Sequence, residues 1–203
     1  MARRPAPDTR ERILEAADRL FYEVGVHAVG TQQIIEDCGC GKNLLYREFP
    51  SKDDLVGAYL ERRQDVWRHA VEEATAPLAD DPAGQLIAIV NLAADQVRSR
   101  DYRGCPFLKA HAEHAELDHA GQRIPVLHQR ELNDQLLILA KRARLRRPRE
   151  TADRIMLIIQ GLYATGAVLG DEFARTAVDL AEQILDDASP GGSPPTRRAA
   201  QRT

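Results

Sequence analysis

The chain has 203 residues, of which 43% are hydrophobic and 29% charged, with a formal net charge of −3. Three cysteines, an odd number, argue against a disulfide scaffold, and no segment has the apolar core of a signal peptide or the roughly 18 apolar residues of a membrane span. We therefore expect a soluble, cytoplasmic globular protein with no membrane partner.

Helical periodicity runs through nearly the whole chain, and strand alternation is rare. In chain order, the expected helices cover about residues 9–24, 31–38, 42–49, 51–74 and 82–98, then two segments opened by Pro106 and Pro125, and finally 148–170 and 172–188. The sequence therefore predicts an all-α fold of about nine helices.

Capping residues mark several helix starts. Asp8 with Glu11, and Ser51 with Asp54, have the spacing of a capping box, in which each residue satisfies a backbone amide near the other. Thr31 is expected to be the N-cap of the second helix.

The second and third helices, residues 31–38 and 42–49, are joined by a short glycine-containing turn, as in a helix-turn-helix. Leu45 and Phe49 are four residues apart and are expected to point inward against Ile34. The second helix of such a pair can lie in the major groove of DNA.

The outward face of the third helix has side chains that suit DNA. Arg47 can bridge the two acceptors of guanine, Asn43 can pair with adenine, and Leu44 can cover a thymine methyl group. Lys42 and Thr31 can contact phosphates. The negative net charge is no objection, because readout needs only a local surface.

The stretch from Thr9 to Leu60 also resembles the DNA-binding domain of the TetR (tetracycline repressor) family. The residues that carry the resemblance are Thr9, Ile13, Ala16, Ala17, Leu20, Phe21, Gly25, Thr31, Ile35, Gly39, Leu45, Tyr46, Phe49, Ser51, Lys52 and Leu55. The resemblance implies DNA contacts by Thr31, Lys42, Asn43, Leu44, Tyr46, Arg47 and Lys52.

Three positions depart from the family pattern. The usual A-G-V-S turn is C-G-C-G here, and we expect Cys38 and Cys40 to pack as small buried apolar groups. Glu48 replaces a histidine and is expected to fold back onto Lys52, although it could instead accept from a cytosine. Glu36 replaces an alanine and makes the second helix more polar.

The rest of the chain resembles the family's helical ligand-binding and dimerisation half. Residues 154–170 are apolar on nearly every face, and Gly161, Ala164, Gly166 and Ala167 keep one flank small. We expect a homodimer through the last two helices of each subunit, which would bind a pseudo-palindromic double-stranded DNA operator.

The middle segments are expected to line a cavity for a small-molecule effector. The candidate ligand-binding residues are Trp67, Phe107, Leu108, His111, Met156, Gln160 and Tyr163. The basic run 141–149 is expected to be a solvated loop, and Arg3 and Arg4 could reach a minor groove.

Other functions stay open at this point. A metal-responsive regulator could use donors among Cys105, His111, Glu113, His114, Glu116, Asp118 and His119. A thiol-responsive regulator could use the paired cysteines, and an enzyme could use Cys105 with a nearby histidine as a nucleophile pair.

The favoured hypothesis is a TetR-like transcriptional regulator, most simply a repressor released from its operator by a small molecule, without enzymatic activity or a cofactor. The expected organisation is a flexible basic arm over 1–8, the helix-turn-helix domain over 9–50, the ligand-binding and dimerisation domain over 51–188, and a disordered tail over 189–203.

Overall fold

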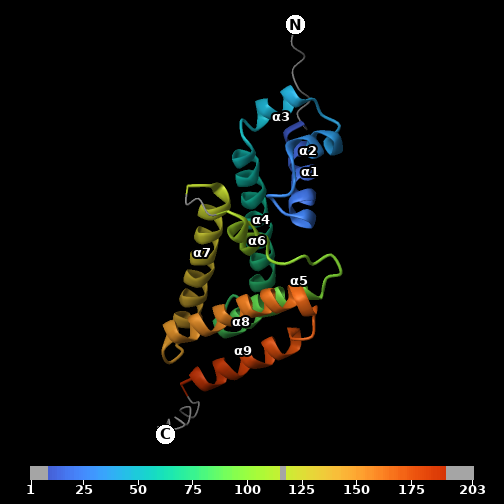
Figure 1. Cartoon of the computed structure of the whole chain (residues 1–203). Coiled ribbons are helices and arrows are strands. Elements are labelled where there is room, and N and C mark those ends of the chain that lie inside the picture. The colour runs from blue at the N-terminus through green and yellow to red at the C-terminus, as the bar shows by residue number, and fades with distance from the viewer. Residues whose placement is uncertain (1–8, 115–117, 191–203) are drawn as a thin grey trace, which may run out of the picture. The chain divides into compact units, whose positions relative to one another are not determined.

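The computed structural model describes residues 9–114 and 118–190. Nine α-helices and one 3-10 turn account for nearly all of this part of the chain, so the predicted all-α class is confirmed (Figure 1). The helices are α1 (Thr9–Val24), α2 (Thr31–Cys38), α3 (Lys42–Glu48), α4 (Lys52–Thr75), α5 (Pro82–Arg98), α6 (Pro106–Glu113), α7 (Ala120–Arg142), α8 (Pro148–Leu169) and α9 (Ala174–Ala188); the 3-10 turn is Ala76–Leu78.

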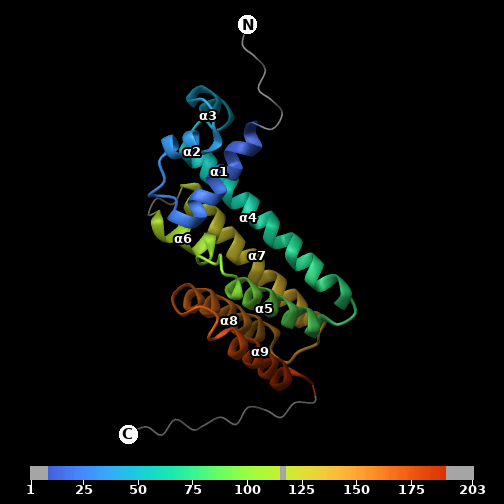
Figure 2. The same ribbon diagram turned by 90° about the vertical axis from the view of Figure 1, so that its right-hand side faces the viewer.

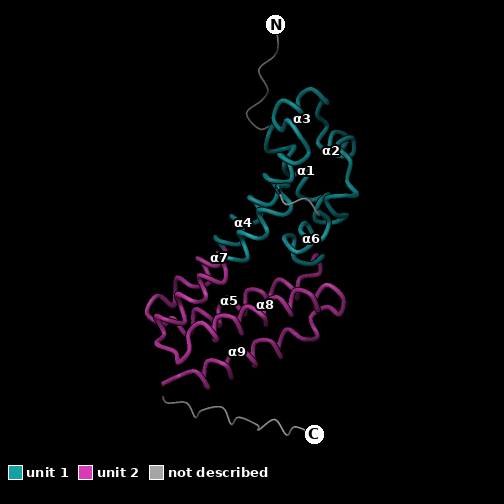
Figure 3. Tube along the Cα trace, turned by 60° about the vertical axis from the view of Figure 1, so that its left-hand side comes forward, with its two compact units in different colours: residues 1–69, 103–130 teal, residues 70–102, 131–203 magenta. Residues whose placement is uncertain are grey.

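The chain forms two compact units, coloured separately in Figure 3. Unit 1 contains residues 1–69 and 103–130, and unit 2 contains residues 70–102 and 131–203. The helices α4 and α7 each begin in unit 1 and end in unit 2. The functional division at residue 50 expected from the sequence stays a prediction.

The core of unit 1 is built on α1. Ile13 and Phe21, on one face of α1, are at most 1% exposed, and the Phe21 ring meets the Tyr59 ring of α4 edge-on at 5.5 Å. Leu45 and Phe49 are 1% and 2% exposed, and Ile34 is fully buried. The predicted inward face of the third helix is therefore confirmed, and its opposite face is left for other contacts.

Unit 2 is formed mainly by α5, α8 and α9, which pack against one another (Figure 2). Ile89 of α5, Ile155 and Ile159 of α8, and Ala181 of α9 are fully buried. Gly166 of α8 lies against the side chain of Val97 of α5, which fills the space that a side chain at residue 166 would need. The small residue therefore serves packing inside the subunit.

Two helix starts differ from the sequence prediction. The helix α7 begins at Ala120 and contains Pro125, which was expected to open it. A proline removes one amide bond to the residue four positions earlier, here Gly121 in the first turn, so the helix tolerates it near its start. The N-cap of α2 is Gly30, whose amide donates to Gln33 Oε1 at 2.7 Å, and Thr31 is the first helical residue.

The cap predicted for the fourth helix is confirmed. The Ser51 amide donates to Asp54 Oδ2 at 2.9 Å, and the Asp54 amide donates to Ser51 Oγ at 3.0 Å. This reciprocal pair of hydrogen bonds fixes the start of α4 shortly after the end of α3.

Among the helices that the structure describes, one, α8, has the length and apolar composition to cross a membrane, and a third of its most apolar window is buried within the protein. A core helix of a soluble protein passes the same test.

Candidate DNA-binding interface

The turn between α2 and α3 is only three residues long. Gly39 ends α2 in the left-handed region, at φ 60° and ψ 30°. The backbone amides of Gly39 and Cys40 both donate hydrogen bonds to the Ile35 carbonyl. Gly41 is the N-cap of α3. A glycine at residue 39 adopts this conformation without the steric cost that a side chain would add.

The exposed face of α3 carries the side chains predicted to read DNA. Lys42, Asn43 and Arg47 are exposed, Tyr46 is 38% exposed, and Leu44 is half-buried. The face lies at the end of unit 1 opposite α6 (Figure 2). It therefore presents two cations, an amide and a phenol to solvent, which are the groups that contact phosphates and base edges.

Two contacts order this face. The Lys42 ammonium lies 5.9 Å from the centre of the Tyr46 ring, and the Tyr46 hydroxyl lies 3.4 Å from Thr31 Oγ1. The second contact joins α3 to the first residue of α2, where backbone amides are available to an anion. Thr31 and Tyr46 thus come together although they are 15 residues apart.

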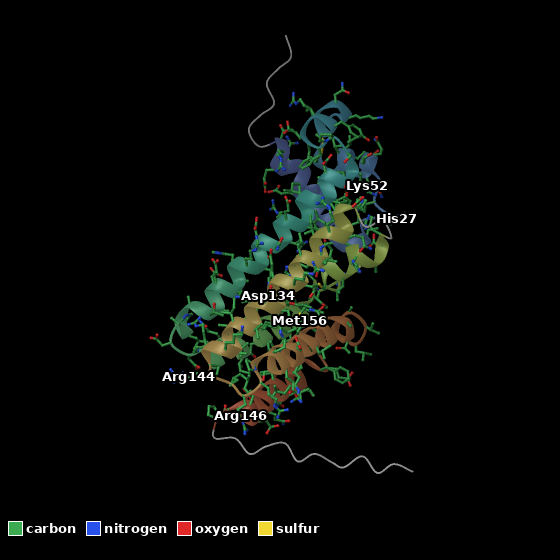
Figure 4. All side chains as sticks on the ribbon, turned by 90° about the vertical axis from the view of Figure 1, so that its left-hand side faces the viewer. His27, Lys52, Asp134, Arg144, Arg146 and Met156 are labelled. Carbon is green, nitrogen blue, oxygen red and sulfur yellow. A yellow bond between two sulfur atoms is a disulfide. The ribbon has the colours of Figure 1, made fainter. Side chains whose placement is uncertain are left out.

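Glu48 does not fold back onto Lys52. Its Oε1 accepts from Arg47 Nη2 at 3.3 Å, while Lys52 Nζ lies 3.5 Å from the carbonyl of His27, beside which it is seen in Figure 4. Burial lowers the pKa of Lys52, and Glu113 opposes this effect. The expected Glu48–Lys52 pair was wrong because the side chain of Lys52 turns toward the loop before α2.

Cys38 and Cys40 are joined by a disulfide, with their Cα atoms 5.4 Å apart. Cys38 is buried as expected, but Cys40 is only half-buried. The expectation of two separate apolar groups was wrong, because the left-handed residue between them turns both side chains to one side. The sequence predicted the glycine-containing turn at this place but not the bond across it.

Three arginines of α1 lie near the reading helices without having been selected from the sequence. The guanidinium of Arg10 stacks over the Phe49 ring at 4.7 Å, and Arg12 Nη2 donates to the Cys38 carbonyl at 2.6 Å. Arg19 pairs with Asp37. Their partners are 18 to 39 residues away, so no local pattern would have revealed them.

Four of the candidate ligand-binding residues belong to unit 1. Trp67 and Phe107 are buried and both meet the buried His128, edge-on at 6.4 Å and stacked at 3.7 Å. Leu108 and His111 are exposed. The structure therefore brings two of the four together around a histidine that the sequence did not single out.

The other three candidates belong to unit 2. Tyr163 is buried, and its hydroxyl donates to Gln96 Oε1 at 2.9 Å while its ring stacks on Tyr102 at 6.3 Å. Gln160 Nε2 donates to the sulfur of Met156 at 3.7 Å, and both side chains are half-buried. Met156 is labelled in Figure 4. These residues line the α8 side of the unit 2 core.

The metal and enzyme alternatives gain no support from the described residues. Within 9–114 and 118–190, no group of three or more His, Cys, Asp or Glu side chains is placed to hold a metal ion. The rings of His114 and His119 stack at 3.8 Å. Burial raises the pKa of the Cys105 thiol, which disfavours the thiolate that a nucleophile needs.

Other predictions lie outside the described residues. These are the basic arm over 1–8 with Arg3 and Arg4, the metal-ligand candidate Glu116, and most of the tail over 189–203. The basic run 141–149 is described and lies at the end of α7, in the following loop and at the start of α8, where Arg147 pairs with Glu150 at 3.0 Å.

The all-α fold and the exposed cationic face of α3 define a helix-turn-helix DNA-binding protein. Residues 13–59 match the family of bacterial regulatory proteins described as the tetR family. A crystal structure of a TetR-family transcriptional regulator from Streptomyces coelicolor superimposes with a TM-score of 0.84 at 29% identity, covering 90% of this chain and 96% of that one. The helix-turn-helix segment of the chain therefore matches the tetR family, and the described residues have the fold of TetR-family regulators.

Further relatives agree with this assignment. A putative TetR transcriptional regulator from Streptomyces avermitilis gives a TM-score of 0.76 at 26% identity, over 89% of this chain and 97% of that one. The uncharacterized HTH-type transcriptional regulator YxaF of Bacillus subtilis is 29% identical over 100 residues, which are 49% of this chain and 52% of that protein. The chain thus spans about half the length of this curated relative.

Regulators of this family are soluble proteins that bind DNA and form dimers, and they are not enzymes. The protein is therefore a helix-turn-helix transcriptional regulator.

Proposed function

We propose that the protein is a cytoplasmic, non-enzymatic repressor that binds a palindromic DNA operator as a homodimer and leaves it when a small organic molecule binds the helical domain. The observation that carries the proposal is the exposed face of α3, where Lys42, Asn43, Tyr46 and Arg47 stand opposite the buried Leu45.

The division of labour on this face follows from side-chain chemistry. Arg47 and Asn43 are proposed to read base edges, because guanidinium and amide groups pair with guanine and adenine in the major groove. Leu44 is proposed to contact a thymine methyl group. Lys42, Thr31 and Tyr46 are proposed to hold phosphates, as does Lys52 at the start of α4.

The proposed dimer rests on an apolar stripe of α8. Leu157 and Val168 are 71% and 81% exposed on one face of α8, and Gly161 lies on the same face with open space above it. Apolar residues that gather on one exposed face mark an interaction surface. Leu180 of the adjacent α9 is also exposed. Pairing these helices with those of a second subunit would bury the stripe and set two recognition helices about 34 Å apart or a multiple of that distance.

The proposed release mechanism uses α6. This helix carries the buried Phe107, a candidate ligand contact, and two side chains that hold the helix-turn-helix. Lys109 Nζ donates to the Tyr22 carbonyl at 2.7 Å at the end of α1, and the carboxylate of Glu113 accepts from the amide of His27. A ligand that displaces Phe107 would shift the contacts that Lys109 and Glu113 make. The change in DNA affinity would then be set by how much more tightly the ligand binds the shifted conformation than the original one.

Selection of duplexes from a random pool by the purified chain tests the proposal. We expect an inverted repeat to be enriched, and Arg47→Ala to lose one conserved base position. Arg149→Ala removes the same charge from an exposed site in α8 and should enrich the same repeat as the parent. Failure to enrich any sequence, or equal loss in both variants, would show that α3 does not read bases.

A further inference from the structure

The disulfide in the helix-turn-helix has no role in the proposed function so far. It joins Cys38, the last residue of α2, to Cys40, two residues before α3 begins, with only Gly39 between them. In a reducing compartment, such bonds are usually transient and serve catalysis or redox sensing. A bond of this kind, placed between the two helices that contact DNA, is therefore a candidate regulatory site.

Cys38 borders an open groove of about 400 Å³ between α1 and α2. The groove is lined by Arg12, Glu15, Ala16, Arg19, Asp37 and Cys38. Its volume falls in the range of small-molecule sites. The other half of the bond, Cys40, is half-buried, so a small thiol held at this groove can reach the bond without unfolding the domain.

The charges of the groove suit a thiol that bears both carboxylate and ammonium groups. Arg12 and Glu15 supply one cation and one anion, and Arg19 and Asp37, which pair with each other, supply a second charge of each sign at the rim. The Arg12 guanidinium donates to the Cys38 carbonyl, so it stands next to the disulfide. A neighbouring guanidinium stabilises a cysteine thiolate, which is the reactive form in thiol–disulfide exchange.

We propose that Cys38 and Cys40 form a redox site that exchanges with a low-molecular-weight, tripeptide-sized thiol and its disulfide. In reduction, the thiolate of one small thiol attacks the half-buried Cys40 Sγ, the bond to Cys38 breaks, and Cys38 leaves as a thiolate and takes up a proton. A second small thiol then attacks the mixed disulfide and releases Cys40 as a thiol. Two electrons and two protons pass to the protein, and the two small thiols leave as one disulfide.

The consequence for DNA binding rests on the proposed function. With the bond closed, the link from α2 to α3 is a ring that includes Cys38, Gly39 and Cys40, so few conformations of the turn remain. When the bond opens, only Cys40 stands between two glycines, and the start of α3 gains backbone freedom that DNA binding must remove. The oxidised form should therefore bind DNA three- to tenfold more tightly than the reduced form.

The site itself is tested without DNA. The full chain is equilibrated in buffers of reduced and oxidised glutathione, denatured in acid and alkylated, and its free thiols are counted by mass spectrometry. We expect three free thiols to fall to one as the buffer becomes oxidising, with peptide mapping assigning the bond to Cys38 and Cys40. Cys38→Ser/Cys40→Ser should keep one thiol throughout, and Cys105→Ala should still lose two. A parent that keeps three thiols in every buffer refutes the site.

Hydrogen exchange and DNA titration test the consequence. Amides of residues 42–48 should exchange three- to tenfold faster in the reduced parent, whereas the double serine variant should exchange at one fast rate in both buffers. Equal exchange in both states of the parent refutes the effect on α3. If exchange responds but neither state enriches a DNA sequence, the redox site stands and the proposed function fails.

Discussion

Gly166 of α8 is expected to be essential for the packing of unit 2. A Cβ atom at this position would lie 2.8 Å from Cγ2 of Val97 and closer still to Cγ1. Val97 is 3% exposed and its β-branched side chain has one strongly preferred rotamer in a helix, so it cannot swing away. The change Gly166→Ala must therefore push α5 and α8 apart.

The size of the effect follows from two opposing contributions. Overpacking by one methyl group costs about 1–3 kcal/mol. Alanine is a better helix former than glycine by about 0.5–1 kcal/mol, which offsets part of that cost. The expected net loss is about 1–2 kcal/mol, or roughly 2–8 °C in Tm for a chain of this size.

Thermal unfolding followed by circular dichroism, at one fixed protein concentration, measures this loss. Gly161→Ala is the matched control at a protein concentration low enough to give monomers, because a Cβ there meets no atom of its own subunit within 4 Å, and it should raise Tm by about 2–4 °C through helix propensity alone. Combining Gly166→Ala with Val97→Ala should recover part of the loss. If both glycine variants raise Tm alike, the reasoning about α5 and α8 is refuted.

The remaining predictions concern DNA and assembly. In fluorescence anisotropy, Arg47→Ala should weaken binding to the selected duplex by about 1–3 kcal/mol and relax one base position, while Lys52→Ala should weaken all duplexes alike and reduce the salt slope by about 1; equal losses on every sequence would make Arg47 a phosphate contact. Glu48→Gln should raise affinity for selected and random DNA, because it frees Arg47 and removes a charge that repels phosphates; a fall confined to the selected duplex would make Glu48 a base reader. Gly161→Leu should give helical monomers in sedimentation that do not bind DNA, and a persistent dimer would place Gly161 outside the interface.

Local patterns predicted the fold because each depends on neighbours a few residues apart. The four-residue spacing of Leu45 and Phe49 placed both on the buried face of α3, and the spacing of Ser51 and Asp54 located the start of α4. The exposed side chains of α3 followed from the same periodicity. A proline can open a helix or lie inside it near the start. At Pro125 the sequence prediction chose the first, and it placed the start of α7 five residues late.

The sequence could not distinguish the two glycines of α8. Gly161 and Gly166 belong to a set of small residues along one flank of α8, and both were assigned to the dimer interface. The structure places Gly166 against Val97 of α5, so its assignment to the interface was wrong, while that of Gly161 stays a prediction. Periodicity gives the spacing of faces around a helix, but the neighbouring helix decides which face it covers.

The sequence by itself determined the helical class, the helix-turn-helix and the side chains that this motif exposes, because these depend on periodicity, caps and turn residues within about ten positions. Only the tertiary structure decided the partners of the charged and sulfur-bearing side chains. Arg12 reaches the Cys38 carbonyl across 26 residues, and Lys109 reaches Tyr22 across 87. Even the Cys38–Cys40 bond depends on the left-handed backbone of Gly39, which the sequence permits and only the packed turn fixes.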